Sequence, residues 1–149
     1  MTHSILIPLD GSRRAEKVLP QAEDVARRYQ AEVILVKVDE PDILLERDEV
    51  VDPERYSENR KRQRQESEGY LAGIQERLLK SGLSVRTIIV YGPVVKAILE
   101  TLETSGADLV AMASHGVSAL PHQPYGSTAA GIMQGLHCPL LLVPTGQTD

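Results

Sequence analysis

The chain has 149 residues and a net charge of −5, with 42% hydrophobic and 25% charged residues. These values are typical of a single globular domain, residues 1–149, that needs no disulfide or structural metal to stabilise its core. The acidic balance and the aromatic content of 3% argue against a nucleic-acid-binding surface, which uses basic residues and aromatic stacking.

Cysteine content and hydropathy exclude further classes of protein. Cys138 is the single cysteine, so an internal disulfide framework is excluded and we expect it to be a small, buried apolar residue. No apolar run approaches the ~18 residues of a membrane-spanning helix. The first residues lack the basic and long apolar regions of a signal peptide. We therefore expect a cytoplasmic protein with no membrane partner.

Short aliphatic runs alternate with helical stripes along the chain. The runs predict five strands, at Ile5–Leu9, Val33–Val38, Ser84–Val90, Leu109–Ala113 and Pro139–Val143. Between them, apolar residues at three- and four-residue steps predict four helices. These stripes run from Ala15 to Tyr29, from Tyr70 to Leu78, from Val94 to Leu102 and from Gly126 to about Leu136. Ser12 is expected to cap the first helix.

One region lacks this apolar periodicity. Residues 42–68 hold 15 of the 37 charged residues, which predicts an exposed, charged connection at about 40–66 that leads into the second helix. The basic block from Arg60 to Arg64 is balanced by Glu58, Glu66 and Glu68. It therefore indicates a solvated helix face rather than a nucleic-acid site.

The order of the elements fixes the fold class. Strands that alternate with helices pair in parallel through right-handed crossovers. The prediction is a Rossmann-like α/β fold, with a doubly wound five-stranded parallel sheet and four helices on two faces. Ligands of such sheets bind beyond the carboxyl ends of the strands, at the switch point, so we expect a site after the first, second and fourth strands.

A glycine-containing segment leaves the fourth strand and enters the last helix. It reads Ala113-Ser114-His115-Gly116, nine residues, and Gly126-Ser127. Backbone N–H groups at the helix start, with the hydroxyls of Ser127 and Thr128, form a potential phosphate site. A surface loop followed by a capped helix is the alternative. The dinucleotide, P-loop and nucleophile-elbow motifs are absent.

The chain resembles a universal stress protein over nearly its whole length. The family pattern G-x-x-G, nine residues, G-[ST] matches residues 113–127, and residues 5–12 resemble the first strand and turn. Asp108-Leu109-Val110 and residues 138–144 match the fourth and fifth strands. The resemblance implies an adenine nucleotide alpha hydrolase-like fold and a stress-response sensor or regulator that is a homodimer through the strand at Pro139–Val143.

In the ATP-binding branch of this family, the resemblance also implies a site for ATP, ADP or AMP. Pro8 and Asp10 match positions beside adenine and ribose, and Val38 matches an apolar contact after the second strand. The complete predicted set is Pro8, Leu9, Asp10, Val38, Met112, Ala113, Ser114, His115, Gly116, Gly126, Ser127 and Thr128. A carboxylate at the position of Asp10 can accept ribose hydroxyls or hold Mg²⁺, or it can cap the following helix.

Three features depart from the family pattern. Ala113 replaces the first motif glycine, Pro121 and Pro124 stiffen the spacer, and no Lys or Arg follows Lys96. Two alternatives therefore stay open: a degenerate protein that binds no ATP and acts through protein contacts, and a slow nucleotide phosphohydrolase. For the phosphohydrolase no general base with an obvious partner is visible.

Side chains outside the motif add little to these alternatives. Arg13 or Arg14 could supply the missing cation, or both could be solvated residues at the start of the first helix. His115 and His122 flank the phosphate region without partners at metal-ligand spacing, so no metal site is expected.

Overall fold

A computed structural model describes residues 2–41, 53–115 and 125–145. The five strands are β1 (Ser4–Leu9), β2 (Glu32–Asp39), β3 (Val85–Tyr91), β4 (Leu109–Ala113) and β5 (Leu140–Val143). A short 3-10 helix, η1 (Ala15–Val18), runs directly into α1 (Leu19–Tyr29). The other helices are α2 (Pro53–Lys80), α3 (Val94–Ser105) and α4 (Ser127–Gly135). No helix of these three described stretches has the length and apolar character needed to cross a bilayer.

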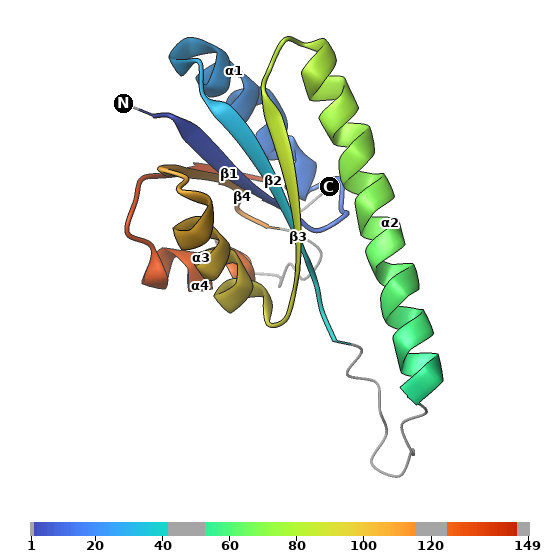
Figure 1. Ribbon diagram of the computed structural model, residues 1–149. Coiled ribbons are helices and arrows are strands. Elements are labelled where there is room, and N and C mark those ends of the chain that lie inside the picture. Colours follow the sequence, from blue (N-terminus) through green and yellow to red (C-terminus); the bar gives the residue numbers. More distant parts are fainter. Residues whose placement is uncertain (1, 42–52, 116–124, 146–149) are drawn as a thin grey trace.

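The strands form one parallel sheet in the order β3-β2-β1-β4-β5. Strand β1 therefore lies between β2 and β4, and the chain moves outward from it in both directions, as Figure 1 shows. The predicted doubly wound α/β fold is confirmed. The connection after β1 leads to β2 on one side, and β4 lies on the other side. At such a switch point the connections leave in opposite directions, so a crevice forms at the carboxyl ends of the strands.

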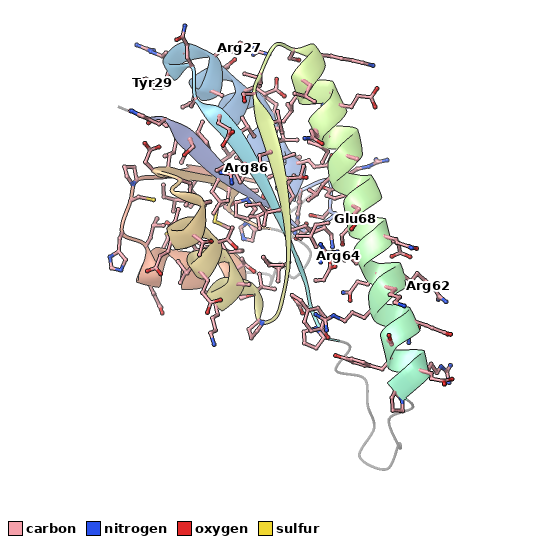
Figure 2. All side chains as sticks on the ribbon, in the orientation of Figure 1. Arg27, Tyr29, Arg62, Arg64, Glu68 and Arg86 are labelled. Atoms are coloured by element: carbon pink, nitrogen blue, oxygen red, sulfur yellow. The ribbon has the colours of Figure 1, made fainter. Side chains whose placement is uncertain are left out.

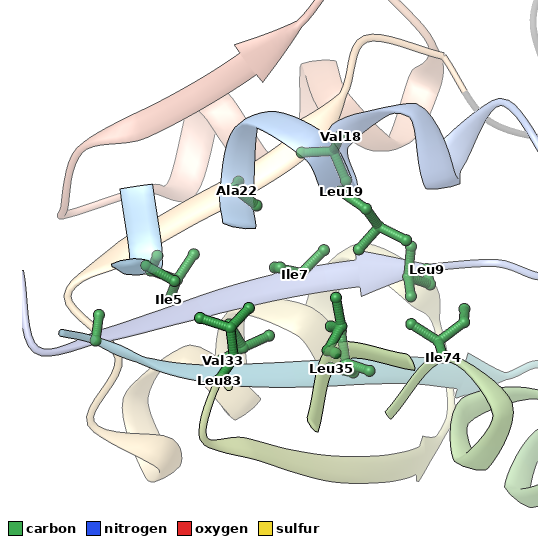
Figure 3. Close-up of a cluster of buried hydrophobic side chains, with 14 of the residues drawn as sticks. Ile5, Ile7, Leu9, Val18, Leu19, Ala22, Val33, Leu35, Ile74 and Leu83 are labelled. Atoms are coloured by element: carbon green, nitrogen blue, oxygen red, sulfur yellow. The ribbon is translucent and has the colours of Figure 1, made fainter. Parts of the chain in front are cut away.

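Two aliphatic cores cover the two faces of the sheet, because side chains alternate along each strand. In β2, Val33 and Leu35 pack with η1, α1 and α2, and this cluster is drawn in Figure 3. Ile34 and Val36 point the other way and pack with α3 and α4. Cys138 packs against the second cluster as an apolar residue, but it is half-buried rather than buried as expected. This partial burial raises the pKa of its thiol.

Helix α2 corrects the predicted connection. It begins at Pro53, so residues 53–66 are helical, while residues 42–52 of the predicted connection lie outside the described residues. The exposure of the region was predicted correctly, since Arg60, Lys61, Arg62 and Arg64 are all exposed. Figure 2 shows Arg62 on the side of α2 away from the sheet, and the exposed Arg64 forms an ion pair with Glu68.

The inner face of α2 explains why its start was missed. Four residues of the amino-terminal half recur at steps of four, three and four, and the same face continues into the apolar half. The face consists of Tyr56, Arg60, Gln63, Ser67, Leu71, Ile74 and Leu78. Only the last three are apolar residues of the core. The residues of this face recur with a helical period along all of α2, but they are polar in the first half and apolar in the second. A search for apolar periodicity therefore detects only the second half.

Polar contacts hold this amino-terminal half against the ends of β2 and β3. The hydroxyls of Tyr56 and Tyr91 are 2.7 Å apart, and the Arg60 guanidinium stacks 3.9 Å from the centre of the Tyr91 ring. Gln63 Nε2 donates to the carbonyl oxygen of Glu40 at 3.1 Å. Helix α2 therefore reaches the carboxyl ends of both strands (Figure 1).

Two glycines let α4 approach α3 closely. A Cβ atom on Gly131 would lie 2.7 Å from Val95 Cγ2, and one on Gly135 would lie 2.6 Å from Leu99 Cδ1. Both distances are shorter than any ordinary carbon contact. The helices can pack at this separation only because the two α4 residues have no side chain, and this packing sets the position of α4 over the sheet.

We expect Gly131→Ala to lower the free energy of unfolding by about 1–3 kcal/mol, because the new methyl group overpacks the stiff, β-branched Val95. Gly73→Ala is the matched control, since Gly73 is an α2 residue with open space around its Cα. That variant should gain about 0.5–1 kcal/mol from helix propensity. Urea denaturation measures both. Equal effects of the two variants would contradict the close packing, and a Val95→Ala background should remove the cost of Gly131→Ala.

Candidate functional site

A cavity of about 410 Å³ opens at the carboxyl ends of β1, β2 and β4, between the sheet and helices α3 and α4. The residues predicted as site residues line it together, apart from Gly116, which lies outside the described residues. They are Pro8, Leu9, Asp10, Val38, Met112, Ala113, Ser114, His115, Gly126, Ser127 and Thr128. The fold thus brings into one place residues that are more than one hundred positions apart in the sequence.

Seven further residues line the cavity and were not predicted: Ala15, Val36, Glu40, Gln63, Val94, Ile98 and Ala129. Val36, Val94 and Ile98 had a signal, because their periodicity placed them in the core beneath the strand ends. Gln63 had none, since it lies in the part of α2 that was taken for a connection. Its carboxamide, bonded to the Glu40 carbonyl, makes α2 one wall of the cavity.

The turn after β1 is shaped by Asp10. Its Oδ1 accepts hydrogen bonds from the Ser12 amide at 2.9 Å and from the Ser12 hydroxyl at 2.6 Å. Ser12 Oγ in turn accepts the Ala15 amide at 3.1 Å, but the N-cap position of η1 is Arg14, so the prediction of Ser12 as the cap is wrong. Gly11 has a φ of +88°, a conformation that favours glycine. Asp10 therefore stabilises the turn before η1, and it also lines the cavity.

Ser114, which is 4% exposed, joins three elements at the end of β4. Its amide donates to the Val143 carbonyl at 2.9 Å, and its carbonyl accepts the Gly126 amide at 2.7 Å. The Ser114 hydroxyl accepts the Thr145 amide at 2.9 Å and lies 2.9 Å from His115 Nδ1. The start of α4 and the end of β5 are thereby fixed beside β4, and His115 is held buried in the cavity wall.

Helix α4 presents its amino terminus to the cavity. The first bond within the helix runs from the Ala130 amide to the Gly126 carbonyl at 3.0 Å. The amides of Ser127, Thr128 and Ala129 come earlier and have no acceptor inside the helix. These three residues line the cavity. Three N–H groups and two hydroxyls therefore provide hydrogen-bond donors at the positive end of the helix dipole.

The backbone here tolerates the departures from glycine. Gly126 has a φ of −70°, which other residues also adopt, so its contribution is the space left by the missing side chain. Gln30 is the non-glycine residue with positive φ in the described stretches. Ala113 consequently needs no left-handed conformation, and its methyl group fits the motif position without backbone strain.

The cavity is acidic. Its charged lining residues are Asp10 and Glu40, and no Lys or Arg lines it among the described residues. Arg13 is exposed, Arg14 is half-buried, and neither belongs to the lining. Over residues 2–41, 53–115 and 125–145, no cluster of three His, Cys, Asp or Glu side chains could hold a metal ion.

A buried ionic cluster supports the wall made by α2. Lys37 Nζ lies 3.2 Å from Asp39 Oδ1 and 2.9 Å from Ser67 Oγ, and Ser67 also donates to Asp39. Tyr70 donates to Glu16 at 3.1 Å. Burial and the nearby Glu16 carboxylate raise the pKa of Tyr70 well above its ordinary value, so it remains a neutral donor. These contacts clamp α2 to β2 and η1.

The chain belongs to the universal stress protein family, because the family model matches residues 1–144. A curated relative, the universal stress protein YxiE of Bacillus subtilis, is 27% identical over 96% of this chain and 99% of its own length. The solved structure of the hypothetical protein MJ0577 is 27% identical and superposes with a TM-score of 0.86, covering 99% of both chains.

Two solved structures of the same fold contain adenine nucleotides. One is a universal stress protein in complex with cAMP, 18% identical with a TM-score of 0.69 over 97% of this chain and 98% of its own. The other is a family protein from Arabidopsis thaliana with AMP bound, 13% identical with a TM-score of 0.69 over 97% of this chain and 93% of its own. Both share the fold of this chain.

We expect Ser114→Ala to lower the free energy of unfolding by about 1–3 kcal/mol, because the buried Thr145 amide loses its acceptor. Ser105→Ala is the control, since that hydroxyl makes only long contacts of 3.4 Å at the end of α3. It should change stability by less than about 0.5 kcal/mol. Urea denaturation followed by far-UV circular dichroism measures both, and a cost as small for Ser114 as for Ser105 would refute the role of this hydroxyl.

Proposed function

We propose that this protein binds an adenine nucleotide in the cavity and acts in the cytoplasm as a homodimeric sensor or regulator of the stress response. One observation carries the proposal: a single cavity has apolar walls at the strand ends and backbone donors at the start of α4. A nucleotide has the matching chemistry, with a flat apolar base at one end and phosphate oxygens at the other.

The predicted roles follow from the surroundings of each group. Val36, Val38 and Met112 offer aliphatic surface for a base, and the Asp10 carboxylate offers an acceptor for ribose hydroxyls. Ser127 and Thr128 offer amides and hydroxyls to a phosphate. The bound cAMP and AMP of the two structural neighbours support nucleotide binding in general. We propose Gly116, the remaining motif residue, for the same phosphate site.

ATP, ADP and AMP are all candidates, and Mg²⁺ would enter with the phosphates rather than reside in the protein. Binding, not turnover, is the proposed activity. His115 is the residue of the cavity that would have to act as a general base for hydrolysis, and its Nδ1 already forms a hydrogen bond with the Ser114 hydroxyl. A nucleotide here would contact β1, β2, β4 and α4 at once, so its binding would affect the sheet on both sides of β1.

Gly126→Val tests the phosphate end. We expect the affinity for AMP and ATP to fall at least tenfold, or about 1.4 kcal/mol, because an isopropyl group would fill the space before the first α4 amides. Isothermal titration calorimetry measures the affinity. Gly69→Val is the control, since Gly69 is an exposed α2 residue with nothing within 4 Å. An unchanged affinity in folded Gly126→Val would refute the assignment.

Mass analysis of the small molecules released from freshly purified, denatured protein tests the function itself. Adenine nucleotide at about one equivalent per chain supports the proposal. Protein that neither releases nor binds any adenine nucleotide would favour the degenerate alternative, which acts through protein contacts.

The dimer is proposed through β5, which ends the sheet beyond β4. The Pro139 carbonyl accepts from Val110 and the Val143 carbonyl accepts from Ser114, so the odd-numbered residues of this strand face β4. The N–H and C=O groups of Leu140 and Leu142 then point outward, because alternate residues of a strand face opposite sides. An open, apolar edge favours pairing with a second copy about a twofold axis.

Leu142→Pro should convert the dimer to a monomer, because it removes an outward N–H and leaves the bonds to β4 in place. Leu142→Ala, which loses the same side chain but keeps the N–H, should remain dimeric. Sedimentation velocity at micromolar concentration measures both. A wild-type monomer, or a Leu142→Pro dimer, would exclude this interface.

A further inference from the structure

We propose that the amino-terminal half of α2, residues 53–66, is a hinged arm that leaves and rejoins the ends of β2 and β3 as a unit, while residues 67–80 stay packed on the sheet. The cavity wall that Gln63 forms moves with this arm. The effect on a ligand rests on the proposed function, whereas the motion of the arm does not. The inference follows from the burial of the two halves, the contacts that dock the arm, and the cluster where the packed half begins.

The two halves of α2 differ in burial. From residue 53 to residue 66 every residue is exposed except Gln63, which is half-buried. None of them belongs to the two aliphatic clusters of the described residues. In residues 67–80, by contrast, Ser67, Leu71, Ile74 and Leu78 are at most 7% exposed. The hydrophobic effect therefore holds the carboxyl-terminal half on the sheet and contributes little to holding the arm.

The arm has little helical stability of its own. It is about four turns long, and isolated helices of that length are marginal in water. Arg60 and Arg64 carry like charges one turn apart, which weakens a helix. The ion pair of Arg64 with Glu68 crosses into the packed half, but both side chains are mostly exposed, so it contributes little. The order of the arm therefore depends on its contacts with the strands.

Polar contacts at the surface dock the arm. The hydroxyls of Tyr56 and Tyr91 are 2.7 Å apart, the Arg60 guanidinium lies 3.9 Å from the centre of the Tyr91 ring, and Gln63 Nε2 donates to the Glu40 carbonyl at 3.1 Å. Both hydrogen bonds are exposed, so water can replace either partner and the net gain from each is small. Two of the contacts share Tyr91, so they are lost together when the arm leaves.

A buried polar cluster marks the point where the arm ends. The Ser67 hydroxyl lies 2.9 Å from Lys37 Nζ and donates to Asp39, and Lys37 Nζ lies 3.2 Å from Asp39 Oδ1. Removing one member of a buried ionic cluster leaves an uncompensated charge, so opening should stop before Ser67. The bond from Tyr70 to Glu16 secures the next turn. In Figure 1 the arm is the lower end of α2, away from α1, α3 and α4.

Opening of the arm removes one wall of the cavity. Gln63 and Glu40 both line it, and the bond between them breaks when the arm leaves. A ligand that contacts this wall binds the docked state better than the open state, so it shifts the arm toward docking. By linkage, docking raises the affinity for the ligand by the same factor. The arm is thus a device that regulates the occupancy of the cavity.

Hydrogen–deuterium exchange of the ligand-free protein, followed by mass spectrometry of overlapping peptides, tests the arm. We expect the amides of residues 57–66 to be at least about tenfold less protected than those of residues 71–78, with one common protection across the arm and a step near Ser67. Equal protection in the two halves would overturn the inference. Protection that rises steadily from the amino terminus would also overturn it, because any helix end frays in that way.

The contact at Tyr91 is tested by a matched pair of variants. Tyr91→Phe removes the hydroxyl that Tyr56 contacts and keeps the ring, so exchange of residues 57–66 should become at least about twofold faster while residues 71–78 stay unchanged. Tyr29→Phe is the control, since Tyr29 is an exposed residue at the end of α1. An effect on the arm no larger than that of the control would show that this contact does not dock it.

The contact at Gln63 is tested in the same way. Gln63→Ala removes the bond to Glu40, whereas Gln65→Ala makes the same change of helix propensity at an exposed residue of the arm outside the lining. Only Gln63→Ala should speed exchange across the arm, again at least about twofold. If neither Gln63→Ala nor Tyr91→Phe acts more strongly than its control, the inference fails.

AMP tests the link between the arm and the cavity. Saturating AMP should slow exchange of residues 57–66 at least about fivefold relative to residues 27–30 at the end of α1, none of which lines the cavity. Bound AMP that leaves exchange of the arm unchanged would overturn the inference, and the proposed function would stand. If no adenine nucleotide binds, the proposed function fails, and exchange in the ligand-free protein decides whether the arm exists.

Discussion

The hydrogen bonds of Ser114 are the constraint on which the rest of the site depends. Its backbone joins β4 to the end of β5 and to the first residue of α4, and its hydroxyl holds Thr145 and His115. A buried polar group of this kind is costly unless every partner is present. The donors at the start of α4 therefore face the crevice because this small side chain sits between the two strands and the helix.

Two other packing arrangements complete the cavity around that point. Gly131 and Gly135 allow α4 to lie close against α3, which places the helix over the apolar strand ends. On the opposite side, Lys37, Asp39 and Ser67 form a buried polar cluster that clamps α2 to β2. Such a cluster fixes the position of α2 more than it adds to the free energy of unfolding, because the cost of desolvating buried charges offsets much of their attraction. Polar contacts thus hold the elements around the cavity in place, while aliphatic side chains line it at the strand ends.

The charge distribution gives this common fold its individual character. A parallel sheet with a crevice at its switch point accepts many ligands, and the residues of the crevice determine which one is favoured. Among the described residues, the charged side chains of the lining are the acidic Asp10 and Glu40, and the start of α4 contributes positive potential.

The sequence by itself determined the strands and the doubly wound order, because buried parallel strands are continuous aliphatic runs. Its resemblance to the universal stress protein family indicated most of the cavity residues at the strand ends. It could not reveal the first half of α2. The inner face of that half is polar, and its partners, Tyr91, Glu40 and Asp39, lie on strands distant in the sequence. Gln63 became a wall of the cavity, and Asp10 and Glu40 came together in its lining, only when tertiary packing joined these elements. The periodicity of a segment shows which of its faces is apolar. A polar contact depends on two residues that can be distant in the sequence, so the pattern of one segment alone does not reveal it.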